Sequence, residues 1–135
     1  IERLRQHLGE LKGKRIGVLG LAFKQNTDDT RDSPAIDLIE RLHAAGSEVL
    51  AYDPIAVVSP SAQSWFTRVD DIYAVTEQAD VVLIATEWDV FRTLEPQKLK
   101  EHLRGTLIFD TRHVLSPERV REAGLIYQGI GRGSA

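Results

Sequence analysis

Short apolar segments alternate with helix-like segments along this chain, and this alternation restricts its fold more than any other feature. Residues 15–21 (RIGVLGL) and 80–86 (DVVLIAT) are nearly continuous apolar runs, as expected of strands buried on both faces. Further strands are predicted at 48–52, 106–110 and 125–130, with a short one near 65–68. Helices are predicted after Ser33-Pro34, near 70–78, at 96–103 and after Ser116-Pro117. This order indicates a parallel sheet covered by helices on both faces.

The predicted fold class is therefore α/β, with a Rossmann-like, doubly wound parallel sheet in three α/β/α layers. The strand order 3-2-1-4-5-6 is expected, and a five-stranded flavodoxin-like sheet is the main alternative. Leu4, Leu8 and Leu11 lie at helical spacing, so residues 1–12 are interpreted as the end of a linker helix that stops at Gly13. Residues 13–135 then form one domain.

The composition excludes several kinds of function. A net charge of -3 gives no electrostatic basis for binding nucleic acid or an anionic membrane, and no apolar run approaches the roughly 20 residues that span a bilayer. The chain has no cysteine, which removes disulfides, thiolate metal ligands and a cysteine nucleophile, and fits a cytoplasmic location. Its four histidines are too scattered to predict a metal site. Because it starts at Ile1 and contains no methionine, we expect it to be a segment of a longer protein.

Four groups of residues follow predicted strands and are expected to share the carboxyl edge of the sheet, where doubly wound folds bind ligands. They are residues 20–24, Asp53, residues 86–89 and residues 110–112. The connection after the first strand is unusual, because twelve residues (21–32) separate it from the helix at Ser33-Pro34, where about 2–6 are common. A long polar loop at this edge favours a ligand clamp.

Within this loop, Lys24 and Arg31 are suited to phosphate oxygens, and Phe23 could present its ring and backbone to a ligand. The alternative is that both cations only neutralise nearby acids, namely Asp28, Asp29 and Asp32. The glycines here read G-x-x-G (Gly17 and Gly20), which is not the dinucleotide-binding fingerprint.

Other candidates have more ordinary interpretations. Asp53 could grip a ribose, but a turn formed by Asp53-Pro54 is favoured. Trp88 and Phe91 are predicted to be core or interface aromatics. Ser33 is predicted to be a helix cap and not a nucleophile, and no catalytic residue is expected in this chain.

Residues 20–35 (GLAFKQNTDDTRDSPA) closely resemble the start of the C-terminal, UDP-sugar-binding domain of the UDP-glucose/GDP-mannose dehydrogenase family, in its UDP-glucose branch. The resemblance continues in the family's order with Tyr52-Asp53-Pro54, ATEWDVFR at 85–92, DTRH at 110–113 and YQGIGR at 127–132. It covers nearly the whole chain from Gly13 to Arg132.

The resemblance implies part of an NAD-dependent enzyme that oxidises UDP-glucose to UDP-glucuronate through a cysteine-bound thioester. The NAD-binding domain and the cysteine-bearing central region, which makes the contacts of the homo-oligomer, would lie outside this segment. Phe23 and Lys24 would contact the nucleotide sugar, and Arg31 would reach the NAD phosphates. Without a cysteine, the segment alone is expected to oxidise nothing.

One departure from the family pattern is His113, which stands where many bacterial relatives have asparagine. Related enzymes use UDP-N-acetylmannosamine or GDP-mannose, and these substrates remain alternatives. A free-standing nucleotide-binding regulatory module remains the alternative from a different functional class, because fold alone does not decide function.

Overall fold

The computed structural model describes residues 2–22, 29–30 and 33–129. Its centre is a six-stranded sheet in which every strand pairing is parallel. The strand order is β3-β2-β1-β4-β5-β6, which confirms the predicted doubly wound order and excludes the five-stranded alternative. The strands are β1 (Arg15–Leu19), β2 (Glu48–Tyr52), β3 (Thr67–Arg68), β4 (Val81–Ile84), β5 (Leu107–Asp110) and β6 (Ile126–Gly129).

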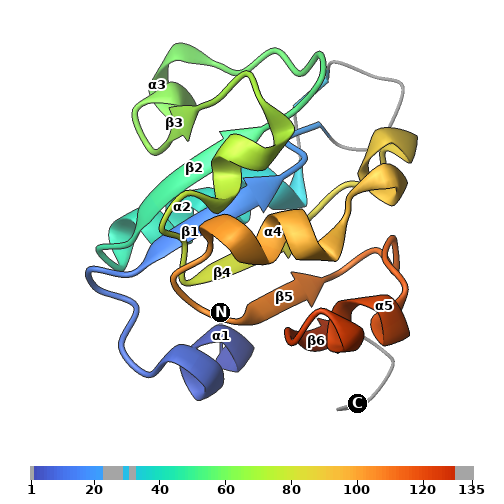
Figure 1. The fold of residues 1–135 in the computed structure, drawn as a ribbon. Coiled ribbons are helices and arrows are strands. Elements are labelled where there is room, and N and C mark those ends of the chain that lie inside the picture. The colour runs from blue at the N-terminus through green and yellow to red at the C-terminus, as the bar shows by residue number, and fades with distance from the viewer. Residues whose placement is uncertain (1, 23–28, 31–32, 130–135) are drawn as a thin grey trace.

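Helices cover both faces of this sheet, and Figure 1 shows α2 and α4 on opposite sides of it. The helical elements are α1 (Glu2–Leu8), α2 (Pro34–Ala44), α3 (Pro60–Gln63), η1 (Ile72–Thr76), η2 (Asp89–Thr93), α4 (Pro96–His102) and α5 (Pro117–Glu122). The elements η1 and η2 are 3-10 helices. The predicted three-layer α/β/α architecture is confirmed.

The core is divided by the sheet into two apolar clusters. Ile39 and Leu42 of α2 belong to the first cluster, with Ile16 and Val18 of β1. The second cluster contains Val75 of η1, Phe91 of η2, Leu99 of α4 and Val120 of α5. Strands buried on both faces need apolar residues at successive positions, which is why the strand segments read as unbroken apolar runs.

The first helix is shorter than predicted. It ends at Leu8 because Gly9 takes a positive φ of 76° and donates its N–H to the carbonyl of Arg5 at 2.8 Å. The predicted stop at Gly13 was therefore wrong. Leu4 and Leu11 are both buried in the first cluster, so this segment packs on the domain.

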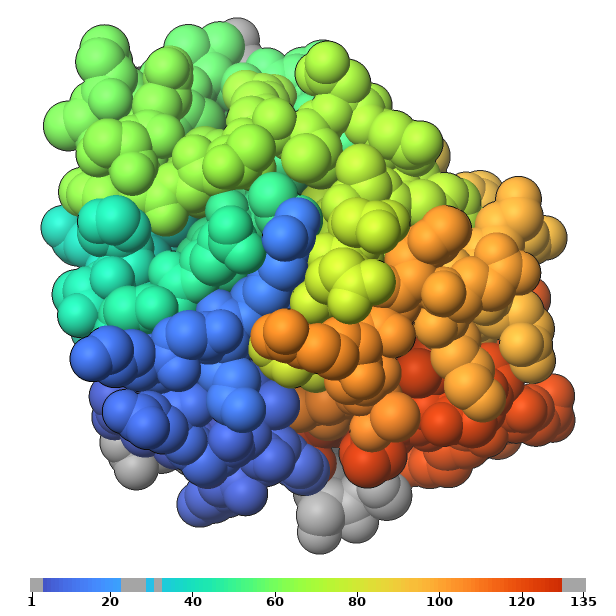
Figure 2. Space-filling view, turned by 60° about the vertical axis from the view of Figure 1, so that its left-hand side comes forward, coloured from blue at the N-terminus to red at the C-terminus, as the bar shows by residue number. Residues whose placement is uncertain are grey.

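At the amino edge of the sheet, opposite the carboxyl ends of the strands, Asp80 joins three segments. Its carboxylate accepts the backbone N–H of Arg15 at 2.8 Å and two bonds from the Arg104 guanidinium, at 3.0 and 2.6 Å. Figure 2 shows the segment entering β1, in blue, adjoining those before β4 and β5, in yellow-green and orange. The bond from Arg104 and the Arg15 N–H lower the pKa of Asp80, against the opposing effect of burial.

The longest described helix is α2, and no helix in residues 2–22, 29–30 and 33–129 is long and apolar enough to cross a membrane.

Candidate functional site

The described residues of the four groups that follow strands share one edge of the sheet, as predicted. Gly20 donates its N–H to Tyr52 at 2.8 Å, and Ala85 donates to Leu19 at 2.8 Å. Thr111 then donates both its N–H, at 3.1 Å, and its hydroxyl, at 2.7 Å, to the carbonyl of Ile84. These bonds join the ends of β2, β1, β4 and β5 in a row. We call this row, residues 20–22, 53, 85–88 and 110–113, the carboxyl rim.

Leu21 and Ala22, shortly after β1, have side-chain hydrogen-bond partners on both their backbone N–H and carbonyl groups. The N–H groups of Leu21 and Ala22 both donate to Oδ2 of Asp53, at 2.8 and 3.0 Å. The carbonyl of Leu21 accepts from the Ser33 hydroxyl at 2.8 Å, and that of Ala22 accepts from the Thr86 hydroxyl at 3.0 Å. All five residues are buried, so these bonds are shielded from water. They fix the backbone immediately before Phe23 and Lys24.

The role of Ser33 differs from the prediction. It occupies the N-cap position of α2, but its side chain makes no capping bond. Its hydroxyl is directed at Leu21 instead, 12 positions earlier. Ser33 therefore ties the start of α2 to the end of β1, which a local capping rule cannot foresee.

Asp53 is the centre of the rim and is 4% exposed. Its Oδ2 also accepts the indole N–H of Trp88 at 3.2 Å, while Oδ1 accepts from Ile55 at 2.9 Å and Ala56 at 2.8 Å. The last two bonds form a turn, so the turn interpretation of Asp53-Pro54 is confirmed. A buried carboxylate with five donors is unavailable to a ribose. Trp88 and Phe91 are buried in the second cluster, as predicted for core aromatics.

The two glycines near β1 serve internal packing. A side chain on Gly17 would collide with the carbonyl group of Val75, whose carbon lies 3.0 Å from the Cβ position. Gly20 has φ +103°, and a Cβ there would lie 2.8 Å from the Thr86 backbone nitrogen. In a dinucleotide fingerprint the glycines give a pyrophosphate access to the backbone. In this chain Val75 and Thr86 fill the space beside these glycines, so the described residues lack this pyrophosphate-binding feature of NAD sites.

A hollow of about 270 Å³ opens beside the rim, on the face of the sheet that α2 covers. It is lined by the start of α2 (Pro34, Ala35 and Leu38), the end of β4 (Leu83 and Ala85) and the turn after β5 (Thr111 and Arg112). Most of this lining is apolar, and the start of a helix favours negative charge. The hollow therefore combines apolar walls with a positive end.

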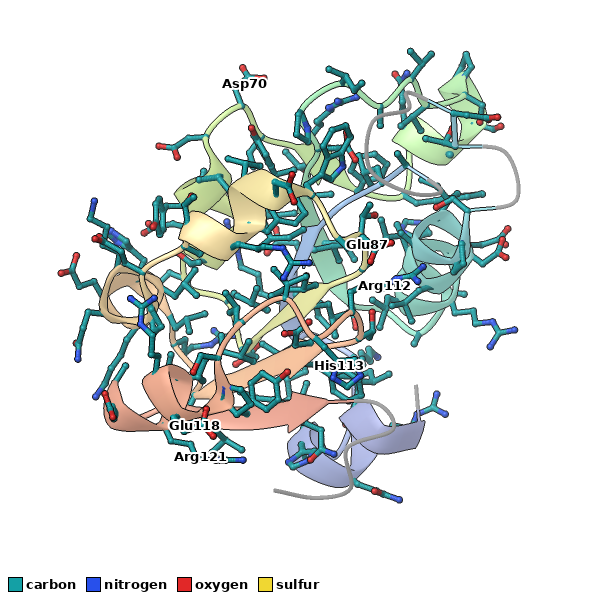
Figure 3. The ribbon with its side chains drawn as sticks, turned by 90° about the vertical axis from the view of Figure 1, so that its right-hand side faces the viewer. Asp70, Glu87, Arg112, His113, Glu118 and Arg121 are labelled. Carbon is teal, nitrogen blue, oxygen red and sulfur yellow. The ribbon has the colours of Figure 1, made fainter. Side chains whose placement is uncertain are left out.

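Arg112 is the charged member of this described lining. Its Nε donates to the carbonyl of Ala85 at 3.3 Å, which directs the guanidinium along the rim. Figure 3 shows Arg112 between the end of β5 and α2, with Glu87 and His113 nearby. Sequence reasoning placed Arg112 at the rim but did not select it as a site residue. Its position directly after a predicted strand was the available signal.

The residues chosen from the sequence, Phe23, Lys24 and Arg31, lie outside the described residues. The chain between them is described only at Asp29 and Thr30, where the Thr30 hydroxyl donates to the carbonyl of Val57 at 2.6 Å. This part of the loop thus lies beside the segment that follows β2.

Within the described part of the chain, no three histidine, aspartate or glutamate side chains group as metal ligands do. The described residues of the site offer hydrogen-bond donors, a guanidinium and apolar walls.

Comparison with known proteins identifies the family of this chain. Residues 17–117 match the UDP binding domain of the UDP-glucose/GDP-mannose dehydrogenase family. The UDP-glucose 6-dehydrogenase TuaD of Bacillus subtilis is 42% identical over 137 residues, which cover 98% of this chain and 29% of that protein. The chain therefore spans less than a third of the length of this relative.

Solved structures share the fold over almost the whole chain. A UDP-glucose dehydrogenase of Pyrobaculum islandicum is 36% identical with a TM-score of 0.75, covering 95% of this chain and 28% of that one. The UDP-D-ManNAc dehydrogenase of Pyrococcus horikoshii is 33% identical with a TM-score of 0.80, covering 99% and 29%. The resemblance inferred from residues 20–35 and the later motifs is confirmed, and the chain belongs to the UDP-glucose/GDP-mannose dehydrogenase family, as its UDP binding domain.

Proposed function

We propose that this domain holds the nucleotide part of UDP-glucose at the carboxyl rim, within an NAD-dependent dehydrogenase that produces UDP-glucuronate. The observation that carries the proposal is the hollow beside the rim, which Arg112 lines together with the start of α2. A guanidinium forms bidentate bonds with phosphate, and apolar walls suit a nucleoside. The hollow is open because this domain supplies one wall of the full site.

Lys24 and Phe23 extend this site from the first loop. They follow Leu21 and Ala22, whose backbone is fixed by Ser33, Asp53 and Thr86, so the chain leaves the rim from a defined point. We assign Lys24 to the ligand through its ammonium group, with Phe23 against the nucleotide sugar. Arg31 is assigned to the phosphates of NAD, across the cleft from this domain.

We propose that NAD binds mainly to a part of the protein outside this segment. The packing around Gly17 and Gly20 and the saturated carboxylate of Asp53 support this division, because the described residues lack the usual dinucleotide grip. The chain also has no cysteine to carry a thioester. Residues 13–135 thus bind substrate, α1 is the end of a linker helix, and oxidation takes place in the full-length homo-oligomer.

UDP-glucose is favoured among the possible nucleotide sugars. The 42% identity to a UDP-glucose 6-dehydrogenase of Bacillus subtilis supports it, as do the NTDD and TEWDVF segments of this sequence. The similar fold of a UDP-D-ManNAc dehydrogenase keeps that sugar as the main competitor.

The proposal is tested by assaying the full-length protein in parallel with UDP-glucose, UDP-N-acetylmannosamine and GDP-mannose, each with NAD. NADH formation with UDP-glucose at a clearly higher kcat/KM than with the other two is expected. Lys24→Ala should then raise the KM for UDP-glucose about 10-fold or more, since a charged hydrogen bond is lost. A protein that uses none of the three, or a Lys24→Ala variant with unchanged constants, would contradict it.

A further inference from the structure

The turn after β5 is closed by one buried carboxylate. Asp110 is fully buried, and its Oδ1 accepts the N–H of Arg112 at 3.1 Å. Its Oδ2 accepts the N–H of Leu115 at 2.9 Å and the hydroxyl of Tyr127 at 3.0 Å. Three donors from two elements therefore converge on Asp110, and one of them belongs to the backbone of Arg112.

Tyr127 lies on the neighbouring strand β6, opposite Ile108 of β5, and is 1% exposed. It is absent from the lining of the hollow, so it does not reach the ligand space directly. Its hydroxyl nevertheless meets the carboxylate that shapes the turn carrying Arg112. The connection runs from Tyr127 to Asp110, and from Asp110 to the backbone of Arg112.

The turn is also fixed from the side of β4. Thr111 makes two bonds to Ile84, and the Nε of Arg112 is bonded to Ala85. The guanidinium of Arg112 is thus held at Nε by Ala85, and the backbone N–H of Arg112 is held by Asp110. These bonds orient the two terminal nitrogens of the Arg112 guanidinium before any ligand binds.

We propose that Tyr127 and Asp110 are positioning residues that orient Arg112 for the nucleotide phosphates, an inference that rests on the proposed function of the rim. Recognition of phosphate by a guanidinium depends on two parallel bonds, so a small rotation of the fork weakens both. Support from a second layer of hydrogen bonds is what fixes such a group within a fraction of an ångström. The Tyr127 hydroxyl is the most remote member of this support.

The experiment is a double-mutant cycle in the full-length protein. The Kd for UDP is measured by calorimetry, at one salt concentration, for the wild type, Tyr127→Phe, Arg112→Ala and the combined variant. Arg112→Ala should weaken UDP binding by roughly 10- to 100-fold and Tyr127→Phe by about 3- to 10-fold. The combined variant should bind UDP as Arg112→Ala does, since the hydroxyl acts only through Arg112.

Tyr73→Phe is the matched control. The Tyr73 hydroxyl accepts the N–H of Glu95 at 2.9 Å, and Tyr73 packs against the second cluster, on the face away from the hollow. This variant also loses one hydrogen bond of a tyrosine hydroxyl, here at an exposed position, and should keep the Kd for UDP. The kcat with saturating UDP-glucose should also stay near the wild-type value in Tyr127→Phe, with the loss confined to KM.

Two results would overturn the inference while leaving the proposed function intact. One is an unchanged Kd for UDP in Tyr127→Phe. The other is a combined variant whose loss of UDP affinity equals the product of the two single losses. An unchanged Kd in Arg112→Ala would instead remove the assigned ligand contact, and the inference with it. If Tyr127→Phe fails to fold, Asp110→Glu replaces it in the same cycle, because it keeps a carboxylate for the buried donors while moving it within the turn, with the same expected coupling.

Discussion

Asp53 and Trp88, 35 positions apart in the sequence, are joined by a buried hydrogen bond of 3.2 Å from the indole N–H to Oδ2. The same oxygen accepts from Leu21 and Ala22, so one atom connects the segments that follow β1, β2 and β4. The strand order places β1 between β2 and β4, which is why their ends can meet at a single carboxylate.

Replacing Asp53 with asparagine should destabilise the domain strongly. Five N–H groups converge on the two oxygens, three on Oδ2 and two on Oδ1, and an amide can offer an oxygen at only one position. At least two buried donors then face an NH₂ group, at a cost of about 2–5 kcal/mol. Urea unfolding measures this loss. Asp70→Asn, at the exposed Asp70 labelled in Figure 3, should be neutral, and an equally neutral Asp53→Asn would refute the assignment.

Gly20→Ala should be more damaging than Gly9→Ala. Both glycines have positive φ, but a Cβ on Gly9 meets no atom within 4 Å, whereas one on Gly20 collides with Thr86. Gly9→Ala is expected to cost about 1–2 kcal/mol from backbone strain alone, and Gly20→Ala at least about 3 kcal/mol. Equal losses in chemical unfolding would show that contact with Thr86 is unimportant.

The stability of the domain should depend on pH through Asp80. Its pKa is lowered in the folded state, chiefly by the bond from Arg104, so its stabilising effect is present above the ordinary aspartate pKa. The effect is lost as the pH falls through the lower folded-state pKa. Asp80→Asn should therefore be less stable than the wild type at pH 7, and the two curves should converge in acid. Arg104→Ala should show the same convergence; parallel curves at all pH values would contradict the assignment.

His113 should accept replacement by asparagine. Its φ is 56°, in the left-handed region where asparagine is favoured and β-branched residues are strained. Within the described part of the chain, its Nδ1 is buried without a hydrogen-bond partner, so little is lost with the imidazole. His113→Asn should keep the melting temperature within a few degrees, and His113→Val should cost about 1–3 kcal/mol. Equal melting temperatures for the two variants would argue against backbone strain.

Elements set by local pattern were predictable from the sequence. The strand predicted at residues 48–52 has its observed bounds, and the helix predicted after Ser33-Pro34 is observed as α2. The short helix η2 (Asp89–Thr93) was missed, because its five residues carry no periodic pattern long enough to detect.

The site itself was only partly predictable. The gathering of four loops at one edge follows from a parallel sheet, which the alternation of strands and helices predicts. The hydrogen-bond partners within that edge could not be predicted in this way. Asp53 accepts from residues more than 30 positions away, and the Ser33 hydroxyl donates to Leu21 and not to its own helix. Such pairings depend on how the strands stack side by side, and no local rule reports them.

The central claim is that the carboxyl rim holds the phosphates of a UDP-sugar, and a crystal structure of the full-length protein with UDP-glucose tests it most directly. The account predicts a diphosphate beside the rim, with its oxygens about 3 Å from the Arg112 guanidinium and the Lys24 ammonium. A nucleotide bound elsewhere in the protein, with both cations free of it, would contradict the account.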